Sequence, residues 1–282
     1  MPELPEVETV VRGLNATVVG RTIDRVWTNA PASSIVVGES LRRKSFAANL
    51  RGKKIKNVTR RGKNILINLT DGLTLWTHLK MTGRFFYVQK NIDVAKHDLA
   101  IFEFKKTSAK SDFHLRFNDT RRFGRLRLYR SSEVNSQIGL KELGPEPLEI
   151  SADAFVKIFR STSRMVKPAL LDQSFMAGIG NIYADETLFY AKIHPRKLTN
   201  RISKNKLLEL YKHIRRTLTK AINKMGTSVD SYQGVNGQPG SFQKYLKAYA
   251  NEGKPCAHCG HEIVREKIGS RSAHFCPRCQ RL

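Results

Sequence analysis

The first helix is indicated by apolar residues at helical spacing near the start of the chain. They lie on one face of a helix over residues 3–14 and are Leu4, Val7, Val10, Val11 and Leu14. Pro5 and the early glutamates suit the first turn, because proline fits an early helical position and acidic side chains complement the helix dipole. The sequence therefore begins with a predicted amphipathic helix.

Strand-like alternation follows from residue 22 to about residue 130. Residues 64–69 and 73–76 flank a Thr70-Asp71-Gly72 turn and predict a hairpin. The same alternation recurs in three further segments, 99–104, 113–117 and 125–129. Many short antiparallel strands in one region predict a β-sandwich or a β-barrel.

Helical spacing returns after the segment Gly144-Pro145-Glu146-Pro147. Helices are predicted at 153–160, 180–192 and 203–225. Ser151 and Ser203 are suitable N-caps for two of them. A looser stretch at 227–241 and a short helix near 241–250 lead into the C-terminal segment.

The net charge narrows the function classes. It is +26, and residues 40–70 alone contain ten basic side chains and no acidic one. Such an excess suits a polyanionic partner, first nucleic acid and second an anionic membrane surface; the alternative is a solvated lysine-rich surface. No run of eighteen apolar residues occurs, so no membrane span is expected. The acidic, proline-bearing start is unlike a signal peptide, which predicts an intracellular protein.

Four cysteines near the C-terminus have the spacing of a zinc site. Two CxxC pairs, Cys256-Cys259 and Cys276-Cys279, are separated by sixteen residues. Each pair turns two sulfurs toward one point, and the intervening segment is long enough for a hairpin. Two disulfides are the alternative, which an intracellular chain disfavours. We expect one structural Zn²⁺, with nearby His258, His261 and His274 as ordinary residues of the ribbon.

Three motifs occur in a fixed order along the chain. It begins Met-Pro-Glu-Leu-Pro-Glu-Val-Glu-Thr, continues through 178–184 (Gly-Ile-Gly-Asn-Ile-Tyr-Ala) and ends in the cysteine segment, with Arg271 five residues before Cys276. Segments 77–83, 118–124 and 143–147 extend the likeness over nearly the whole length. The sequence closely resembles the bacterial formamidopyrimidine-DNA glycosylase family, also called 8-oxoguanine-DNA glycosylases. Its Leu-Pro-Glu-Val-Glu-Thr start favours this purine-lesion branch over endonuclease VIII relatives.

The resemblance implies an α+β multidomain fold. Its parts are an N-terminal β-sandwich with a leading helix, a helix–two-turn–helix domain and a C-terminal four-cysteine zinc finger, with DNA held in the cleft between lobes. The boundaries we expect are a catalytic domain at 1–135, a DNA-binding domain at 136–226, and a lesion-loop linker with the zinc finger at 227–282.

Four residues match the family's catalytic positions. Removal of Met1 would leave Pro2 as a terminal secondary amine, and terminal amines have a pKa of about 7.7–8.0, low enough for nucleophilic attack near neutrality. The resemblance makes Glu3 a proton shuttle, with Glu6 in support, Lys63 a phosphate contact and proton carrier, and Arg271 a phosphate contact that helps the second elimination. From the residues alone, Pro2 could be a helix-leading residue and Lys63 a solvated lysine.

Further positions match DNA contacts of the family. An enzyme that flips a base from the stack must fill the vacancy, and the resemblance assigns this to Met81, Arg121 and Phe123, although core packing could also explain the two apolar residues. Asn181 follows Gly180 at a predicted helix start, where phosphate binds well. Other family-matched or basic candidates for DNA contact are His78, His97, Arg164 and Lys167.

The sequence thus predicts a DNA-formamidopyrimidine glycosylase with DNA-(apurinic or apyrimidinic site) lyase activity. It would excise oxidised purines through a Schiff base and nick the abasic site by β,δ-elimination. The alternatives are an oxidised-pyrimidine glycosylase of the same fold and a noncatalytic zinc-ribbon nucleic-acid-binding protein. We expect damaged double-stranded DNA as partner, a monomer without an obligate protein partner, and a cytoplasmic, nucleoid-associated location.

Overall fold

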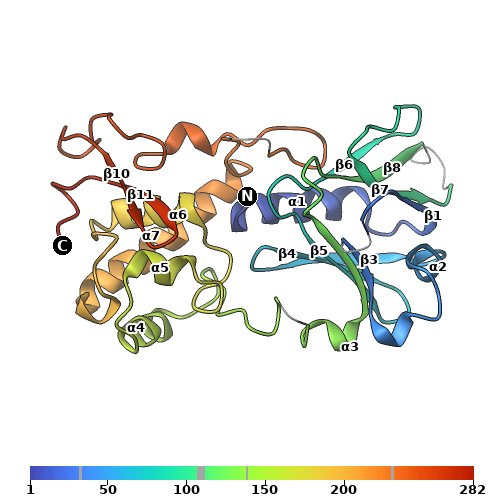
Figure 1. Ribbon diagram of the computed structural model, residues 1–282, viewed down its shortest axis with the longest axis horizontal. Coiled ribbons are helices and arrows are strands. Elements are labelled where there is room, and N and C mark those ends of the chain that lie inside the picture. The colour runs from blue at the N-terminus through green and yellow to red at the C-terminus, as the bar shows by residue number, and fades with distance from the viewer. Residues whose placement is uncertain (32–33, 107–111, 138, 230–231) are drawn as a thin grey trace. The chain divides into compact units, whose positions relative to one another are not determined.

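The chain folds into two compact units (Figure 1). The computed structural model describes residues 1–31, 34–106, 112–137, 139–229 and 232–282. The first unit contains residues 1–141 and 225–241, and the second contains residues 142–224 and 242–282. The segment 225–241 therefore interrupts the second unit and returns to the first. The boundaries expected at 135 and 226 stay a prediction.

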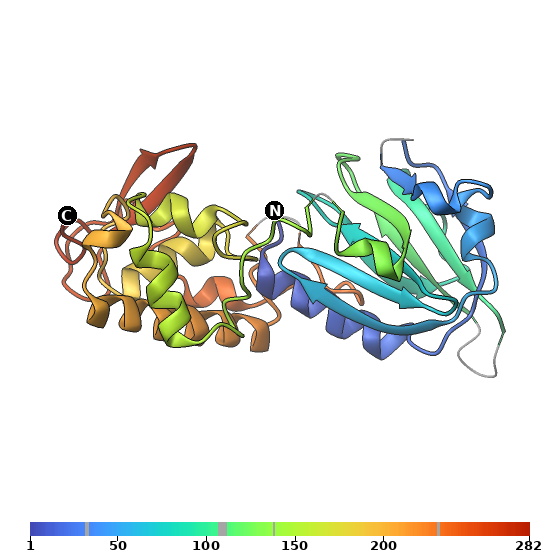
Figure 2. The same ribbon diagram turned by 90° about the horizontal axis from the view of Figure 1, so that it is seen from below.

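Two sheets form the body of the first unit (Figure 2). Within the described residues, one sheet has the strand order β2 (Ile35–Val37), β9 (Arg125–Arg130), β5 (Leu73–His78), β4 (Asn64–Leu69) and β3 (Ile55–Arg61). The other has the order β1 (Ile23–Thr28), β7 (Asp98–Phe104), β8 (Phe113–Asn118) and β6 (Arg84–Gln89). All neighbours are antiparallel except β2 and β9. The predicted hairpin at 64–76 is confirmed as β4–β5.

Alternation explains why these strands form a buried core. Alternate apolar residues of β4 and β9, such as Ile67 and Leu128, lie in a core cluster that also contains Phe117 from the other sheet. The predicted first helix is confirmed as α1 (Leu4–Thr17), whose apolar face joins the same cluster. The side-chain amide of Asn15 attaches α1 to β3, since it donates to the Val58 carbonyl at 2.7 Å and accepts from its N–H at 3.0 Å.

Helices form most of the second unit. They are α4 (Ala152–Arg160), α5 (Val166–Leu171), α6 (Asn181–Tyr190) and α7 (Lys204–Asn223). The predicted caps are confirmed, because the Ser151 and Ser203 hydroxyls accept from the first-turn N–H groups of α4 and α7. The hairpin of β10 (Val264–Ile268) and β11 (Arg271–Phe275) stands out from the helices (Figure 2).

Some short elements differ from the prediction or complete the fold. The helix expected near 241–250 is only a 3-10 turn, η4 (Phe242–Tyr245), and α5 was not predicted. The remaining short helices are η1 (Glu39–Leu41), α2 (Phe46–Leu50), α3 (Ser131–Val134) and η3 (Thr199–Arg201). In the part of the chain that the structure describes, no helix combines the length and apolarity needed to cross a bilayer.

Candidate active site and zinc finger

The start of α1 holds Pro2 in a buried position. Glu3 is the N-cap of the helix and forms a capping box with Glu6: the Glu3 side chain accepts from the Glu6 N–H, and Glu6 Oε2 accepts from the Glu3 N–H at 2.9 Å. Both carboxylates are nearly inaccessible, whereas Met1 remains 43% exposed. These reciprocal bonds fix the backbone at the N-terminus of α1, and they therefore fix the direction of the chain at Pro2, which directly precedes Glu3.

The Glu6 carboxylate also contacts the segment 225–241. Its Oε1 accepts from the Thr227 N–H at 2.7 Å, and a Cβ on Gly226 would lie 2.7 Å from the same oxygen. Gly226 has φ +79°, a conformation that favours glycine. The Tyr232 hydroxyl donates to the Glu6 carbonyl at 3.1 Å, and burial, with the Glu6 charge, raises the pKa of Tyr232. One carboxylate thus joins the helix entrance to this segment, of which residues 230–231 lie outside the described residues.

Lys63 lies in the tight turn between β3 and β4. Gly62 has φ +55° at the first loop position, as in a type II′ hairpin. The Arg60 guanidinium donates to the Gly62 carbonyl at 3.0 Å and to Glu8 of α1 at 3.2 Å. The Lys63 side chain is 6% exposed. Arg60 therefore fixes the turn that carries Lys63 to the helix that begins after Pro2.

Positive charge gathers around His78 at one end of the five-stranded sheet. His78 pairs with Asn64 on one side and with Arg125 on the other. Its Nδ1 accepts from the Lys80 N–H at 2.9 Å. Burial, followed by the charges of Lys80, Lys63 and Arg125, lowers the pKa of His78 to about 3. The ring is therefore neutral at physiological pH and presents Nε2–H as a hydrogen-bond donor.

The three residues expected to fill a vacated base stack are exposed on two loops. Met81 is 42% exposed in the loop between β5 and β6, and Phe123 is 48% exposed in the loop between β8 and β9. The Arg121 guanidinium lies 4.8 Å from the centroid of the Phe123 ring. Large apolar side chains in such positions are unlike core residues, so the core-packing interpretation of Met81 and Phe123 is wrong.

Four further candidates differ in their surroundings. Among the described residues, His97 Nδ1 and the side-chain oxygen of Asn181, the first residue of α6, are buried without a hydrogen-bond partner. Arg164 is exposed and pairs with Asp172 at 2.9 Å. Lys167 is fully buried. Its amine contacts protein groups, namely Asp185 and the Ser272 carbonyl. The role of Lys167 as a DNA contact stays a prediction.

The four cysteines form one cluster whose geometry fits a zinc ion. Their Sγ atoms all lie within 4.8 Å of one another, with Cys259 and Cys276 at 3.6 Å. Zn–S bonds of about 2.3 Å in a tetrahedron separate sulfurs by roughly 3.8 Å. All four are free thiols, so the disulfide alternative is wrong. With four thiolates bound, zinc would have no open position and would serve to hold the finger together.

The cysteine knuckles and nearby histidines are tied to the rest of the second unit. The Cys276 N–H donates to Gln280 Oε1 at 3.0 Å, and Gln280 Nε2 donates to the Ile193 carbonyl at 2.9 Å. His258 stacks on Phe189 with ring centroids 4.9 Å apart. The stacking contact agrees with the expectation that His258 is an ordinary residue of the ribbon.

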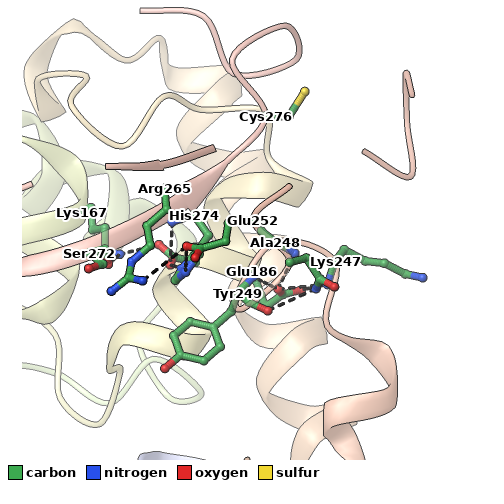
Figure 3. A network of polar contacts seen from close by, with 12 residues as sticks. Lys167, Glu186, Lys247, Ala248, Tyr249, Glu252, Arg265, Ser272, His274 and Cys276 are labelled. Atoms are coloured by element: carbon green, nitrogen blue, oxygen red, sulfur yellow. Dashed lines mark hydrogen bonds and ion pairs between the residues drawn. The ribbon is translucent and has the colours of Figure 1, made fainter. Parts of the chain in front are cut away.

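Buried ionic contacts hold the hairpin that carries Arg271 (Figure 3). The Lys167 amine donates to Asp185 of α6 and to the Ser272 carbonyl, both at 2.5 Å. Asp185 Oδ2 also accepts from the His274 N–H and contacts His274 Nδ1, each at 3.0 Å. Arg271, at the first position of β11, is exposed. The hairpin is thus anchored at Ser272 and at His274, while the neighbouring Arg271 side chain stays exposed.

Sequence reasoning missed the acidic residues of α6. Glu186 accepts from the N–H groups of Lys247, Ala248 and Tyr249, and it is fully buried beside Asp185 (Figure 3). The available signal was a pair of adjacent acidic residues in a predicted helix that has no separate polar face. Such a helix is buried on all sides, so any charge in it must be paired with another group.

The predicted site residues divide between the two units. The first unit carries Pro2, Glu3, Lys63, His78, Met81, His97, Arg121 and Phe123. The second unit carries Arg164, Lys167, Asn181, Arg271, Cys256, Cys259, Cys276 and Cys279. Within the first unit, Lys63 and His78 share one end of a sheet, and the Lys63 turn is attached to the helix that follows Pro2.

Comparisons with known proteins cover the whole chain. Residues 1–126 match the formamidopyrimidine-DNA glycosylase N-terminal domain, 143–233 its H2TH domain, and 253–282 a zinc finger found in FPG and IleRS. A formamidopyrimidine-DNA glycosylase of Pelotomaculum thermopropionicum is 42% identical over the full length of both chains. Two solved structures of Lactococcus lactis FPG superpose with a TM-score of 0.89: a mutant with Fapy-dG-containing DNA, at 35% identity over 100% of both chains, and a complex with abasic-site DNA, at 34% over 99% of this chain and 100% of the other. The chain belongs to the formamidopyrimidine-DNA glycosylase family.

Proposed function

We propose that this protein is a bifunctional DNA repair enzyme that removes oxidised purines, namely 8-oxoguanine opposite cytosine and formamidopyrimidines, and then cuts the strand. The observation that carries the proposal is the buried Pro2 directly before the Glu3-capped helix, in a chain that matches a DNA glycosylase family over its full length. The complexes of the Lactococcus lactis relative with Fapy-dG and abasic DNA support this substrate class.

Pro2 supplies the nucleophile after Met1 is removed. Its amine bonds to C1′ of the damaged nucleotide while the base leaves with the electrons of the glycosidic bond. The sugar ring opens to an iminium, which is the Schiff base. The iminium acidifies the neighbouring C2′ proton, so elimination of the 3′-phosphate follows base loss. The capping box supports this role, because it fixes the backbone next to Pro2 and so gives the Pro2 amine a fixed position.

Three side chains assist the chemistry in the proposed mechanism. Glu3 moves protons to the departing base or the sugar oxygen. Lys63 binds a phosphate and carries a proton for the first elimination, whereas Arg271 binds a phosphate and helps the second elimination. The ionic anchors of the β10–β11 hairpin support the part given to Arg271, because they leave that side chain exposed on a fixed backbone.

The remaining candidates bind the DNA. Met81, Arg121 and Phe123 enter the vacancy left by the flipped base, and Arg121 pairs with the orphaned cytosine. His78, His97, Arg164 and Asn181 contact phosphates, with Lys167 in support. The exposed apolar side chains and the neutral His78 donor support these roles. We propose that the protein acts as a monomer.

Borohydride trapping on lesion duplexes tests the proposal. Processed protein should form a covalent adduct with 8-oxoguanine:cytosine and formamidopyrimidine duplexes, and N-terminal mass spectrometry should show that the adduct begins at Pro2. A Pro2→Gly variant should lose most of the adduct, because a primary amine gives an imine that is charged only while protonated, whereas the secondary amine of proline gives an iminium that is always charged. A thymine-glycol duplex measures the oxidised-pyrimidine alternative in parallel.

Each result decides between the functions. Faster excision of thymine glycol than of 8-oxoguanine would favour the oxidised-pyrimidine enzyme. Active material that still carries Met1, or the absence of any adduct, would rule out the Pro2 mechanism. Tight duplex binding without an adduct would leave the noncatalytic binding protein.

A further inference from the structure

A buried carboxylate links the two loops that carry the exposed insertion residues. Asp119 follows β8 and is 0% exposed. Its Oδ1 accepts from the Arg121 N–H at 3.1 Å and from the Thr82 hydroxyl. Its Oδ2 accepts from the Gly124 N–H at 2.6 Å. One side chain thus spans the loop 119–124 from both ends and reaches across to the loop that contains Met81.

The Thr82 hydroxyl completes the link. While it donates to Asp119, its oxygen also accepts from the Arg121 N–H at 3.2 Å. Thr82 directly follows Met81 in the chain, so the backbone beside Met81 and the backbone at Arg121 share one pair of polar side chains. The backbone of Asp119 adds two further bonds: its N–H donates to the His97 carbonyl at 2.9 Å, and its carbonyl accepts from the Arg122 N–H at 3.3 Å.

These contacts hold an otherwise costly loop conformation. Arg122 has φ +58°, in the left-handed region that non-glycine residues rarely adopt. This residue stands between Arg121 and Phe123, whose side chains lie 4.8 Å apart as a cation–π pair. Bonds on both sides of Arg122 therefore stabilise the backbone on which that pair depends.

We propose that Asp119, with Thr82, is the positioning residue that joins Met81, Arg121 and Phe123 into one preorganised insertion element. The inference rests on the proposed function of these three residues as the group that fills the vacated base stack. Asp119 itself reaches no substrate, because it is buried beneath the loop. Its effect is to fix the distance between the Met81 loop and the Arg121–Phe123 loop before DNA binds. No binding free energy is then spent on ordering the two loops during insertion.

An Asp119→Asn variant tests the link with almost no change in volume. The Asp119 carboxylate accepts from the Arg121 N–H on one oxygen and from the Gly124 N–H on the other, and an asparagine must turn its NH₂ toward one of these two. Because a backbone N–H can only donate, one contact with the loop backbone is lost in either orientation. We expect excision from an 8-oxoguanine:cytosine duplex to fall by about tenfold or more. The preference for cytosine over adenine opposite the lesion should narrow, since Arg121 is no longer held in place.

A substrate without a base stack separates positioning from chemistry. A single-stranded abasic oligonucleotide has no opposite base and no vacancy, so the Asp119→Asn variant should cut it at the wild-type rate. Thr82→Val should reproduce the loss on the duplex, and Thr82→Ser, which keeps the hydroxyl, should restore activity. Thr74→Val is the matched control, because it removes a buried hydroxyl of β5 that bonds Asn68 and Ser131 and contacts neither loop.

Hydrogen exchange in the DNA-free protein provides a second readout. The Arg121 and Gly124 amides should exchange faster in Asp119→Asn and in Thr82→Val, and not in Thr74→Val. Should Asp119→Asn fail to fold, Thr82→Val carries the same comparison. A variant that keeps both the duplex rate and the opposite-base preference overturns the inference, and so does equal loss on the single strand. Failure of wild-type protein to excise any lesion would instead reject the proposed function.

Discussion

Lys63 and His78 lie at one end of the five-stranded sheet, where burial and nearby positive charges lower the pKa of His78. Lys63 is held in a buried turn, and its charge is one of those that keep the His78 ring neutral. A charged lysine can bind phosphate and move a proton, whereas the neutral histidine can only donate a hydrogen bond through Nε2–H. At the residue scale, the proposed proton carrier, Lys63, and the proposed hydrogen-bond donor, His78, therefore share this end of the sheet.

Replacing Lys63 should slow strand cutting more than Schiff-base formation. In Lys63→Ala, we expect strand scission at an abasic site to be about 10²–10⁴ times slower, the usual contribution of a positioned proton carrier. Rapid-quench gels give the rate, and borohydride trapping gives the adduct. Lys56→Ala is the control, because it removes the same charge from an exposed position on β3. Equal effects in the two variants would show that charge alone matters.

Stability should depend on pH through His78. Its pKa is about 3 in the folded protein and 6.5 otherwise, so the unfolded chain binds more protons between these values. The contribution of the neutral ring is fully present above pH 6.5 and is lost as the pH falls toward 3. Urea unfolding of His78→Gln should therefore show a smaller decline of the free energy of unfolding with acid than wild type does. Parallel declines would contradict this assignment.

The β10–β11 hairpin shows how an element obtains its direction from contacts outside itself. Five-residue strands have little stability alone, and this pair is held by the zinc ligands behind it and by Lys167 and Asp185 beside it. Lys167 lies on α5, a helix too short to be recognised by periodicity. The cysteine spacing in the sequence did predict the hairpin. The sequence could not show that α5 supports it, because that support depends on the buried ion pair between Lys167 and Asp185.

Breaking the Lys167–Asp185 pair should loosen the hairpin. In Lys167→Met, Asp185 loses its buried lysine partner, and we expect the free energy of unfolding to fall by about 3–5 kcal/mol. Products of abasic-site cutting should shift from δ- toward β-elimination, since Arg271 loses its fixed backbone. Denaturant unfolding and product gels measure these effects. The double variant with Asp185→Asn should recover part of the stability; strictly additive losses would argue against a coupled pair.

The whole molecule combines two units that are interleaved in sequence. Local patterns were enough to predict α1, the β4–β5 hairpin and the long helices, because their periodicity and caps lie in adjacent residues. They could not show that residues 225–241 return to the first unit, where Tyr232 and Val235 enter its core. The family's motifs identified candidate site residues, whereas Asp119 and Asp185 required the three-dimensional contacts.

Zinc removal should affect one unit and spare the other. Both tryptophans of the chain, Trp27 and Trp76, lie in the first unit, so their fluorescence reports on that unit alone. After chelation, duplex binding should be lost, since the finger loses the metal that holds it, while tryptophan emission stays unchanged. Thiol titration verifies release of the four cysteines. Undiminished binding by protein with four reactive thiols would contradict the role of the finger.

The return of residues 225–241 has a consequence for how the chain is made in the cell. The core around α1 cannot be completed until Tyr232 and Val235 have left the ribosome, and at about 5–20 residues per second this takes roughly ten to fifty seconds after Pro2 emerges. During that interval Glu6 lacks its contacts with Thr227 and Tyr232. The late synthesis of this segment thus leaves time for an aminopeptidase to act on the nascent chain before those contacts close around the start of α1.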